Sequence, residues 1–119
     1  HSPMARNGGP MTELLFAGGF NLKGPWGDVT GVNITPDPSG ISCYDEDLFI
    51  RTLRTGHVGA RPLNSIMPWA YFRNMNDDDL KAIFAFLRTV PPKQHRVDNS
   101  EPPTLCPLDG GYHGFGDRN

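Results

Sequence analysis

The chain has 119 residues, which is enough for one domain and short for two. Hydrophobic residues make up 37% of it, and 14 glycines and 12 prolines predict a small, loop-rich domain with a thin apolar core. The formal net charge of −2 argues against nucleic-acid binding, which requires clustered lysine and arginine. No apolar run approaches the roughly 20 residues of a membrane-spanning helix, so we expect no transmembrane segment.

The N-terminal third is predicted to be mostly irregular. Residues 1–30 are rich in glycine and proline and show no sustained hydrophobic period. Turn signals lie at 24–27 and 33–40. The stretch 29–34 is predicted to be extended chain.

A first helix is predicted over residues 46–55. Asp45 is a good N-cap, and Gly56 follows the last turn, where a left-handed residue commonly ends a helix. Arg51 and Arg54 lie toward the C-terminal end, where the helix dipole favours positive charge. The apolar stripe consists of Phe49, Ile50 and Leu53.

A second helix is predicted over residues 77–89, after a loop at 59–71. Asn76 is its N-cap, three aspartates fill its first turn, and Pro91 follows its end. Its apolar residues recur at helical spacing: Leu80, Ile83, Phe84 and Leu87. We therefore expect a domain over 1–92, followed by an irregular tail over 93–119 that wraps over the surface or reaches a partner.

Cys43 and Cys106 are too few and too far apart for a zinc site or a redox dithiol. In an oxidising compartment they could pair with each other. Two free thiols are an equal alternative.

Met67 is the residue whose setting most favours a functional role. A methionine is usually a flexible core filler. Here Pro68 stiffens the loop, and aromatic residues crowd the same segment at 69–72. A rigid, apolar loop that presents a thioether sulfur suits an axial haem ligand.

Several motifs, taken in order, resemble one protein family. They include Gly-Pro-Trp-Gly at 24–27, Asn-Ile-Thr-Pro-Asp at 33–37, Asp-Glu-Asp at 45–47, Arg-x-x-Arg-x-Gly at 51–56, Arg-Pro-Leu at 61–63, Met-Pro-Trp at 67–69 and Met-Asn-Asp-Asp-Asp-Leu at 75–80. Over about 18–92 this pattern resembles the c-type cytochrome domains of bacterial periplasmic dehydrogenases. The resemblance implies a mainly α, loop-rich, cytochrome c-like fold around one haem c.

The resemblance also implies the two metal ligands. The methionine of Met-Pro-Trp is the distal ligand in that family, which assigns Met67. The proximal ligand is the histidine of Cys-x-x-Cys-His, which makes His1 look like the end of that motif. We expect the two cysteines and an N-terminal helix to precede His1. No cysteine in the sequence stands in that position.

Other cofactor contacts follow from the resemblance alone. Trp26, Trp69 and Tyr71 are expected to help line the haem pocket, although aromatic residues are also common in cores. Arg51 and Arg54 are candidates for contacts with the haem propionates, although arginines on a helix are more often surface residues.

The expected function is one-electron transfer in the periplasm by a single haem with His/Met ligation. The protein would be a carrier, not a catalyst, and a subunit or partner of a larger redox complex that can be membrane-associated. The alternative is a structural subunit of such a complex that has lost its haem. Haem held by axial ligands alone, or copper bound by an N-terminal histidine with a second histidine, are further alternatives.

Overall fold

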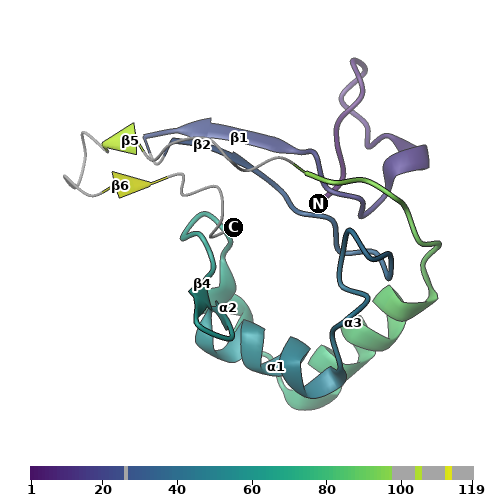
Figure 1. Cartoon of the computed structure of the whole chain (residues 1–119), viewed down its shortest axis with the longest axis vertical. Helices are drawn as coiled ribbons and strands as arrows, with labels where there is room; N and C mark the ends of the chain where they lie inside the picture. The colour runs from purple at the N-terminus through teal and green to yellow at the C-terminus, as the bar shows by residue number, and fades with distance from the viewer. Residues whose placement is uncertain (26, 98–103, 106–111, 114–119) are drawn as a thin grey trace.

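The structure is a computed structural model that describes residues 1–25, 27–97, 104–105 and 112–113. The α-helices gather in one half, and the β1–β2 ribbon crosses the other (Figure 1). The described helices are η1 (Thr12–Leu14), α1 (Glu46–Thr55), α2 (Trp69–Phe72) and α3 (Asp77–Thr89). The described strands are β1 (Asn21–Gly24), β2 (Gly27–Thr30), β3 (His57–Val58), β4 (Arg61–Pro62), β5 (Thr104–Leu105) and β6 (Tyr112–His113).

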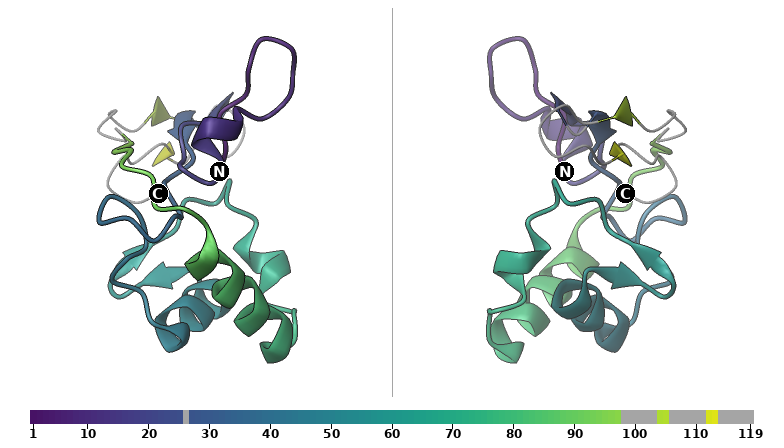
Figure 2. Two further views of the ribbon diagram at one scale, coloured as in Figure 1. Left: turned by 90° about the vertical axis from the view of Figure 1, so that its right-hand side faces the viewer. Right: turned by 90° about the vertical axis from the view of Figure 1, so that its left-hand side faces the viewer.

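The strands form three antiparallel two-stranded pairs, β1 with β2, β3 with β4 and β5 with β6. Residues 4–10 form a small loop closed by a bridge between Met4 and Pro10, and this loop projects from the rest of the molecule (Figure 2). The expected mainly helical, loop-rich fold class is confirmed. Among the described residues, none of the helices combines the length and apolarity that a membrane span requires.

Both predicted long helices are confirmed, together with their caps. Asp45 accepts a hydrogen bond from the Leu48 N–H at 2.7 Å, and Gly56 ends α1 in the left-handed region with φ of 71°. Asn76 accepts from the Asp79 N–H at 2.7 Å at the start of α3. These ends are fixed by local bonds, which is why the sequence predicts them well.

The predicted loop over 59–71 is wrong in part. It contains β4, which pairs with β3, and it ends in α2, which begins at Trp69. No side chain caps α2, and its first turn is closed instead by a bond from the Tyr71 N–H to the Pro68 carbonyl at 3.0 Å. The predicted extended stretch at 29–34 is regular only as far as Thr30, where β2 ends.

The helices pack on a small core formed by Ile41, Phe84 and Leu87. The rings of Phe49 on α1 and Phe84 on α3 lie 5.2 Å apart and join the two helices. Partly buried residues around this cluster are Phe16, Ile34, Tyr44 and Phe49.

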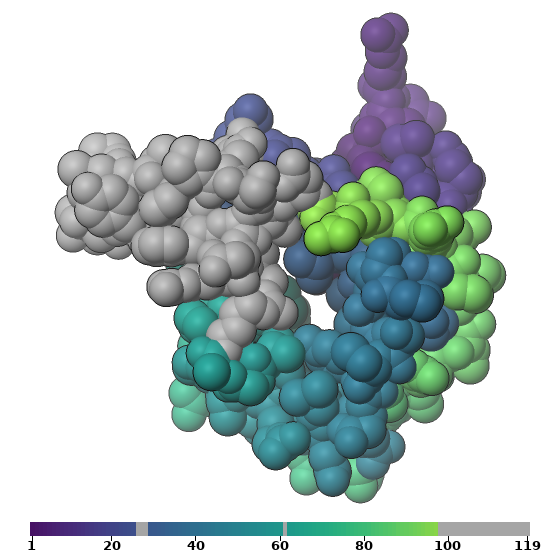
Figure 3. Space-filling view, viewed as in Figure 1, coloured from purple at the N-terminus to yellow at the C-terminus, as the bar shows by residue number. Residues whose placement is uncertain are grey.

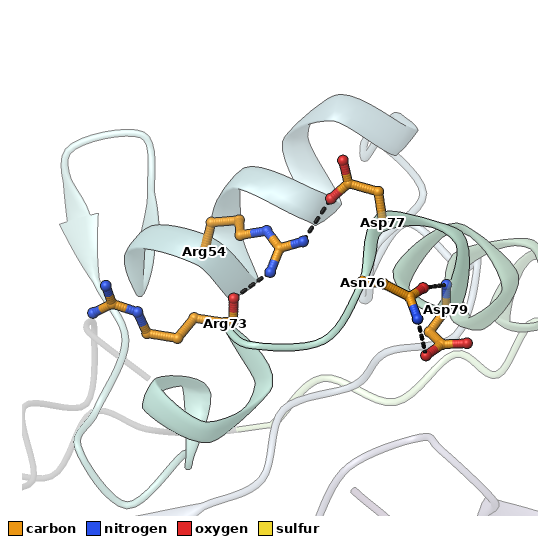
Figure 4. Close-up of polar contacts among 5 residues, drawn as sticks. All are labelled: Arg54, Arg73, Asn76, Asp77 and Asp79. Atoms are coloured by element: carbon orange, nitrogen blue, oxygen red, sulfur yellow. Dashed lines mark hydrogen bonds and ion pairs between the residues drawn. The ribbon is translucent and has the colours of Figure 1, made fainter.

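Polar contacts at the edge of the helical half join α1 to α3. The Arg54 guanidinium donates to the Arg73 carbonyl and forms an ion pair with Asp77 at 2.5 Å (Figure 4). Beside it, Asn76 contacts the Asp79 carboxylate as well as its N–H.

Candidate functional site

His1 is held in a defined orientation by residues on both sides of the β1–β2 ribbon in the sequence. Its Nδ1 lies 2.8 Å from the Val32 carbonyl oxygen, and its own carbonyl accepts from the Gly18 N–H at 2.7 Å. A carbonyl can only accept, so Nδ1 carries the ring proton of the neutral imidazole. The Nε2 lone pair of this exposed residue is therefore available to a metal.

Gly18 supports the peptide group that orients His1. It has φ of +79°, and a Cβ at this position would lie 2.6 Å from the Val32 carbonyl carbon and 2.7 Å from the Asn33 nitrogen. No side chain fits between these two backbone segments, so the close approach requires glycine. The Val32–Asn33 peptide thus lies directly against the segment bonded to His1.

Met67 lies half-buried in the loop between β4 and α2. The Asn64 carbonyl accepts from the Met67 N–H at 3.0 Å, and the Asn64 side chain accepts from the Ile66 N–H at 3.0 Å. The Met67 carbonyl in turn accepts from the Trp69 N–H at 2.7 Å. Short-range hydrogen bonds therefore fix the loop backbone both before and after Met67.

The Trp69 ring packs over the end of α1. A Cβ on Gly56 would lie 2.4 Å from Trp69 Cε2, so the indole covers this glycine directly. The contact fixes α2, and with it the Met67 loop, against the longer helix.

The other residues predicted to contact the haem are exposed, already bonded to other residues, or outside the described part of the chain. Tyr71 is 80% exposed, and Arg51 is exposed on α1. The Arg54 guanidinium is already engaged by Arg73 and Asp77. Trp26 lies outside the described residues. Cofactor contacts by these residues stay predictions.

Of the two cysteines, Cys43 is exposed and forms no disulfide with another described residue. Cys106 lies outside the described residues. Pairing of the two cysteines and two free thiols both stay predictions.

The two predicted metal ligands belong to different halves of the molecule. The N-terminus lies beside the β1–β2 half, and α2 lies in the helical half (Figure 1). The space-filling view shows an opening between these halves, bordered in part by residues coloured blue and light green (Figure 3). A cavity of about 490 Å³ is lined by Val32, which bonds to His1, and by Asn33, Pro38, Ser39, Arg96 and Val97.

A buried polar cluster around Asn33 is the feature that the sequence did not reveal. The motif Asn-Ile-Thr-Pro-Asp predicts a turn, but nothing in it predicts a hydrogen-bond partner 60 residues away. In the structure the Asn33 side chain is 3% exposed and donates to the Lys93 carbonyl at 2.8 Å.

Asp37 takes part in the same turn. It accepts from both the hydroxyl and the N–H of Ser39, at 2.6 and 2.8 Å. These bonds, the hydroxyl bond first, hold the pKa of the Asp37 carboxyl below its ordinary value.

The chain is similar in sequence to components of several bacterial dehydrogenases. It is 38% identical over 73 residues, 60% of the chain, to the cytochrome c subunit of a quinone-dependent alcohol dehydrogenase from Gluconobacter oxydans. It is 38% identical over 102 residues, 82% of the chain, to one of the subunits of a nicotinate dehydrogenase from Pseudomonas putida. It is 33% identical over 97 residues, 79% of the chain, to the cytochrome subunit of a fructose dehydrogenase from Gluconobacter japonicus.

The matched region is a small part of each relative. It spans 15% of the alcohol dehydrogenase subunit, 9% of the nicotinate dehydrogenase subunit and 19% of the fructose dehydrogenase subunit. No protein-family model matches the chain. The similarity supports the cytochrome c-like character expected from the sequence motifs.

Proposed function

We propose that this chain is an electron-transfer domain that binds a single haem c, with His1 as proximal and Met67 as distal ligand. The observation that carries the proposal is the bond from His1 Nδ1 to the Val32 carbonyl. A histidine that ligates a metal usually donates a hydrogen bond from its other ring N–H to such a carbonyl. His1 has this arrangement, with Nε2 left for iron.

In the opposite half, Met67 is the residue that we propose as the second ligand of the same cofactor. Met67 supplies a soft thioether from a loop whose backbone is held by Asn64. Haem iron with a histidine and a methionine supplies one-electron redox chemistry at a raised potential. With these two residues in the axial positions, the chain would leave no coordination site for a substrate, so its role would be to carry electrons.

Covalent attachment and the surrounding contacts belong to the same proposal. His1 would be the last residue of Cys-x-x-Cys-His, with the cysteines supplied from its N-terminal side. Trp69 would support the Met67 loop from α1, as its packing on Gly56 indicates. Lining of the haem by Trp26 and Tyr71, and propionate contacts by Arg51 and Arg54, are proposed on the resemblance alone.

The cellular setting is also a proposal. Relatives named as cytochrome subunits of dehydrogenases favour a redox partner, with this domain as one part of a larger chain or complex. We propose that it works in the periplasm, between such a dehydrogenase and an acceptor. We propose that the domain spans 1–92 and the tail 93–119, with the first residues of the tail, 93–95, hydrogen-bonded to the domain.

The first experiment is absorption spectroscopy of the protein produced with its natural flanking sequence in a host that attaches haem c. We expect a low-spin reduced spectrum, and we expect Met67→Ala to abolish it because the thioether is removed. The control is Met4→Ala, since Met4 is 50% exposed in the projecting loop. An unchanged Met67→Ala spectrum would exclude Met67 as distal ligand. A colourless but folded preparation would favour the structural-subunit alternative.

A further inference from the structure

Asn33 is the centre of a buried hydrogen-bond cluster next to His1. Its Nδ2 donates to the Lys93 carbonyl at 2.8 Å, to Ser39 Oγ at 3.0 Å and to the His95 carbonyl at 3.2 Å. Its Oδ1 accepts from the Thr35 N–H at 2.9 Å and from the Thr35 hydroxyl at 2.8 Å. Both ends of the amide are therefore satisfied at a position that is 3% exposed.

The same cluster holds the chain that follows α3. The Lys93 N–H donates to Thr35 Oγ1 at 3.2 Å, and the His95 N–H donates to Ser39 Oγ at 3.0 Å. Residues 93–95 and 33–39 are thus joined by bonds in both directions. Because buried polar groups are costly when left unpaired, removal of one member weakens the whole cluster.

Two series of contacts connect this cluster to His1. Asn33 follows Val32, whose carbonyl accepts the bond from His1 Nδ1. The His95 ring lies 2.8 Å from the Ala17 carbonyl, and Gly18, the next residue, donates to the His1 carbonyl. The cluster therefore fixes both the acceptor of the imidazole and the backbone that holds His1.

We infer that Asn33 is a positioning residue for the His1 imidazole: its buried amide fixes the Val32–Asn33 peptide so that the Val32 carbonyl holds the Nδ1–H and aims Nε2 at the iron. This inference rests on the proposed function for its effect on iron, but not for the orientation of the ring. Hydrogen bonding at Nδ1 makes an imidazole a stronger donor and tunes the redox potential of the metal.

The direction of the effect follows from this donor strength. A stronger imidazole donor favours oxidised iron, which carries the higher charge. When the Val32 carbonyl is no longer fixed, the hydrogen bond from Nδ1–H to this carbonyl lengthens. The imidazole then becomes a weaker donor and favours oxidised iron less. The midpoint potential then shifts to a more positive value.

The test compares Asn33→Leu with Asn76→Leu. Both changes replace an asparagine by an apolar residue of similar size without changing charge. Asn76 caps α3, and its bonds are to Asp79. Two quantities are measured in each: the midpoint potential of the haem-loaded protein and the solvent exchange rate of the His1 Nδ1–H by NMR.

We expect Asn33→Leu to raise the potential and to speed the Nδ1–H exchange at least several-fold. Asn76→Leu lowers stability and leaves both quantities as in the wild type. Should Asn33→Leu fail to fold, Ser39→Ala replaces it, because it removes one acceptor of the amide and the bond to His95. Ser39→Ala is then expected to move both quantities in the same directions by a smaller amount.

The inference is overturned if the folded Asn33 or Ser39 variant shows wild-type exchange at His1. It is also overturned if Asn76→Leu moves the potential and the exchange rate equally, since general destabilisation would then explain both. If the wild type binds no haem, the proposed function fails, and the Nδ1–H exchange of the haem-free protein decides the inference alone.

Discussion

Gly56 shows how one residue joins two elements. It ends α1 with a positive φ, and the Trp69 ring of α2 lies where its side chain would be. Two separate physical requirements, a left-handed backbone and an empty volume, therefore apply at this position. The sequence predicted the first from the helix end alone, and the second is visible only once α2 is placed.

A comparison of Gly56→Ala with Gly59→Ala separates the cost of the left-handed backbone from the cost of filling the volume under Trp69. Gly59 has φ of +60°, and a Cβ there would meet no atom within 4 Å. We expect Gly59→Ala to cost about 1–2 kcal/mol of unfolding free energy for the left-handed backbone. Gly56→Ala should cost roughly 1–3 kcal/mol more because Trp69 must shift. Urea denaturation measures both, and equal losses would contradict the packing of Trp69 on Gly56.

Asp37 is a single residue that makes the stability of the fold depend on pH. Bonds from Ser39 lower the folded-state pKa of its carboxyl. Because the folded value lies below the unfolded one, the stability that this group contributes is present above the unfolded pKa of about 3.9 and is lost as pH falls through the folded value.

We expect Ser39→Ala to raise the pKa of Asp37 toward its ordinary value, since the hydroxyl bond is the larger cause of the shift. Carboxyl NMR titration of Asp37 measures the change directly. Ser42→Ala, at an exposed position in the next turn, serves as the control. A pKa that stays low in Ser39→Ala would show that the backbone N–H of residue 39 is sufficient.

At the scale of elements, the sequence predicted α1 and α3 because their signals are local. Asp45 and Asn76 cap the helices by bonds three residues along the chain, and Gly56 ends α1 within one residue. The apolar spacing predicted for α3 is confirmed at Leu80, Phe84 and Leu87, which are buried, but not at Ile83, which is 37% exposed. Such features depend little on the rest of the fold.

Elements and site features that depend on distant partners were missed. The four-residue helix α2 has no side-chain cap and is stabilised by Trp69 packing on Gly56. The Asn33 amide bonds to Lys93, a partner that no periodicity or spacing indicates. The ligand assignments to His1 and Met67 came from the family resemblance, and the structure adds the Val32 acceptor, which the sequence did not suggest.

The junction of α1 and α3 offers a comparison of apolar and ionic contacts. Phe84 is 8% exposed and faces Phe49, whereas the Arg54 and Asp77 side chains are 31% and 64% exposed. We expect Phe84→Ala to lose about 3–5 kcal/mol of unfolding free energy. Asp77→Ala should lose about 1 kcal/mol or less, because an exposed ion pair is screened by water.

Chemical denaturation of both variants checks this order. Lys81→Ala, an exposed position on α3, is the control for a helix substitution outside the junction. Similar losses for Phe84→Ala and Asp77→Ala would mean that the ion pair stabilises the junction as much as the aromatic contact does.

The whole molecule has little apolar interior for its size. The buried hydrophobic residues of the described chain are Ala17, Val29, Ile41, Leu53, Leu80, Phe84 and Leu87. Of these, Ile41, Phe84 and Leu87 form the one buried cluster described between the helices and the loops. The two halves meet through the polar cluster around Asn33, through backbone bonds, and through Phe16, whose ring lies 5.8 Å from that of Phe86 on α3. An opening remains between them elsewhere (Figure 3).

A ligand that joins the halves should therefore stabilise the whole fold. If His1 and Met67 hold one haem from opposite sides, its binding adds to the free energy of unfolding, because only the folded chain brings the two ligands together. We expect the haem-loaded protein to melt at a clearly higher temperature than the haem-free protein, as followed by far-ultraviolet circular dichroism. Met67→Ala should reduce this difference, and Met4→Ala should preserve it. Equal melting temperatures with and without haem would show that the cofactor does not bridge the two halves.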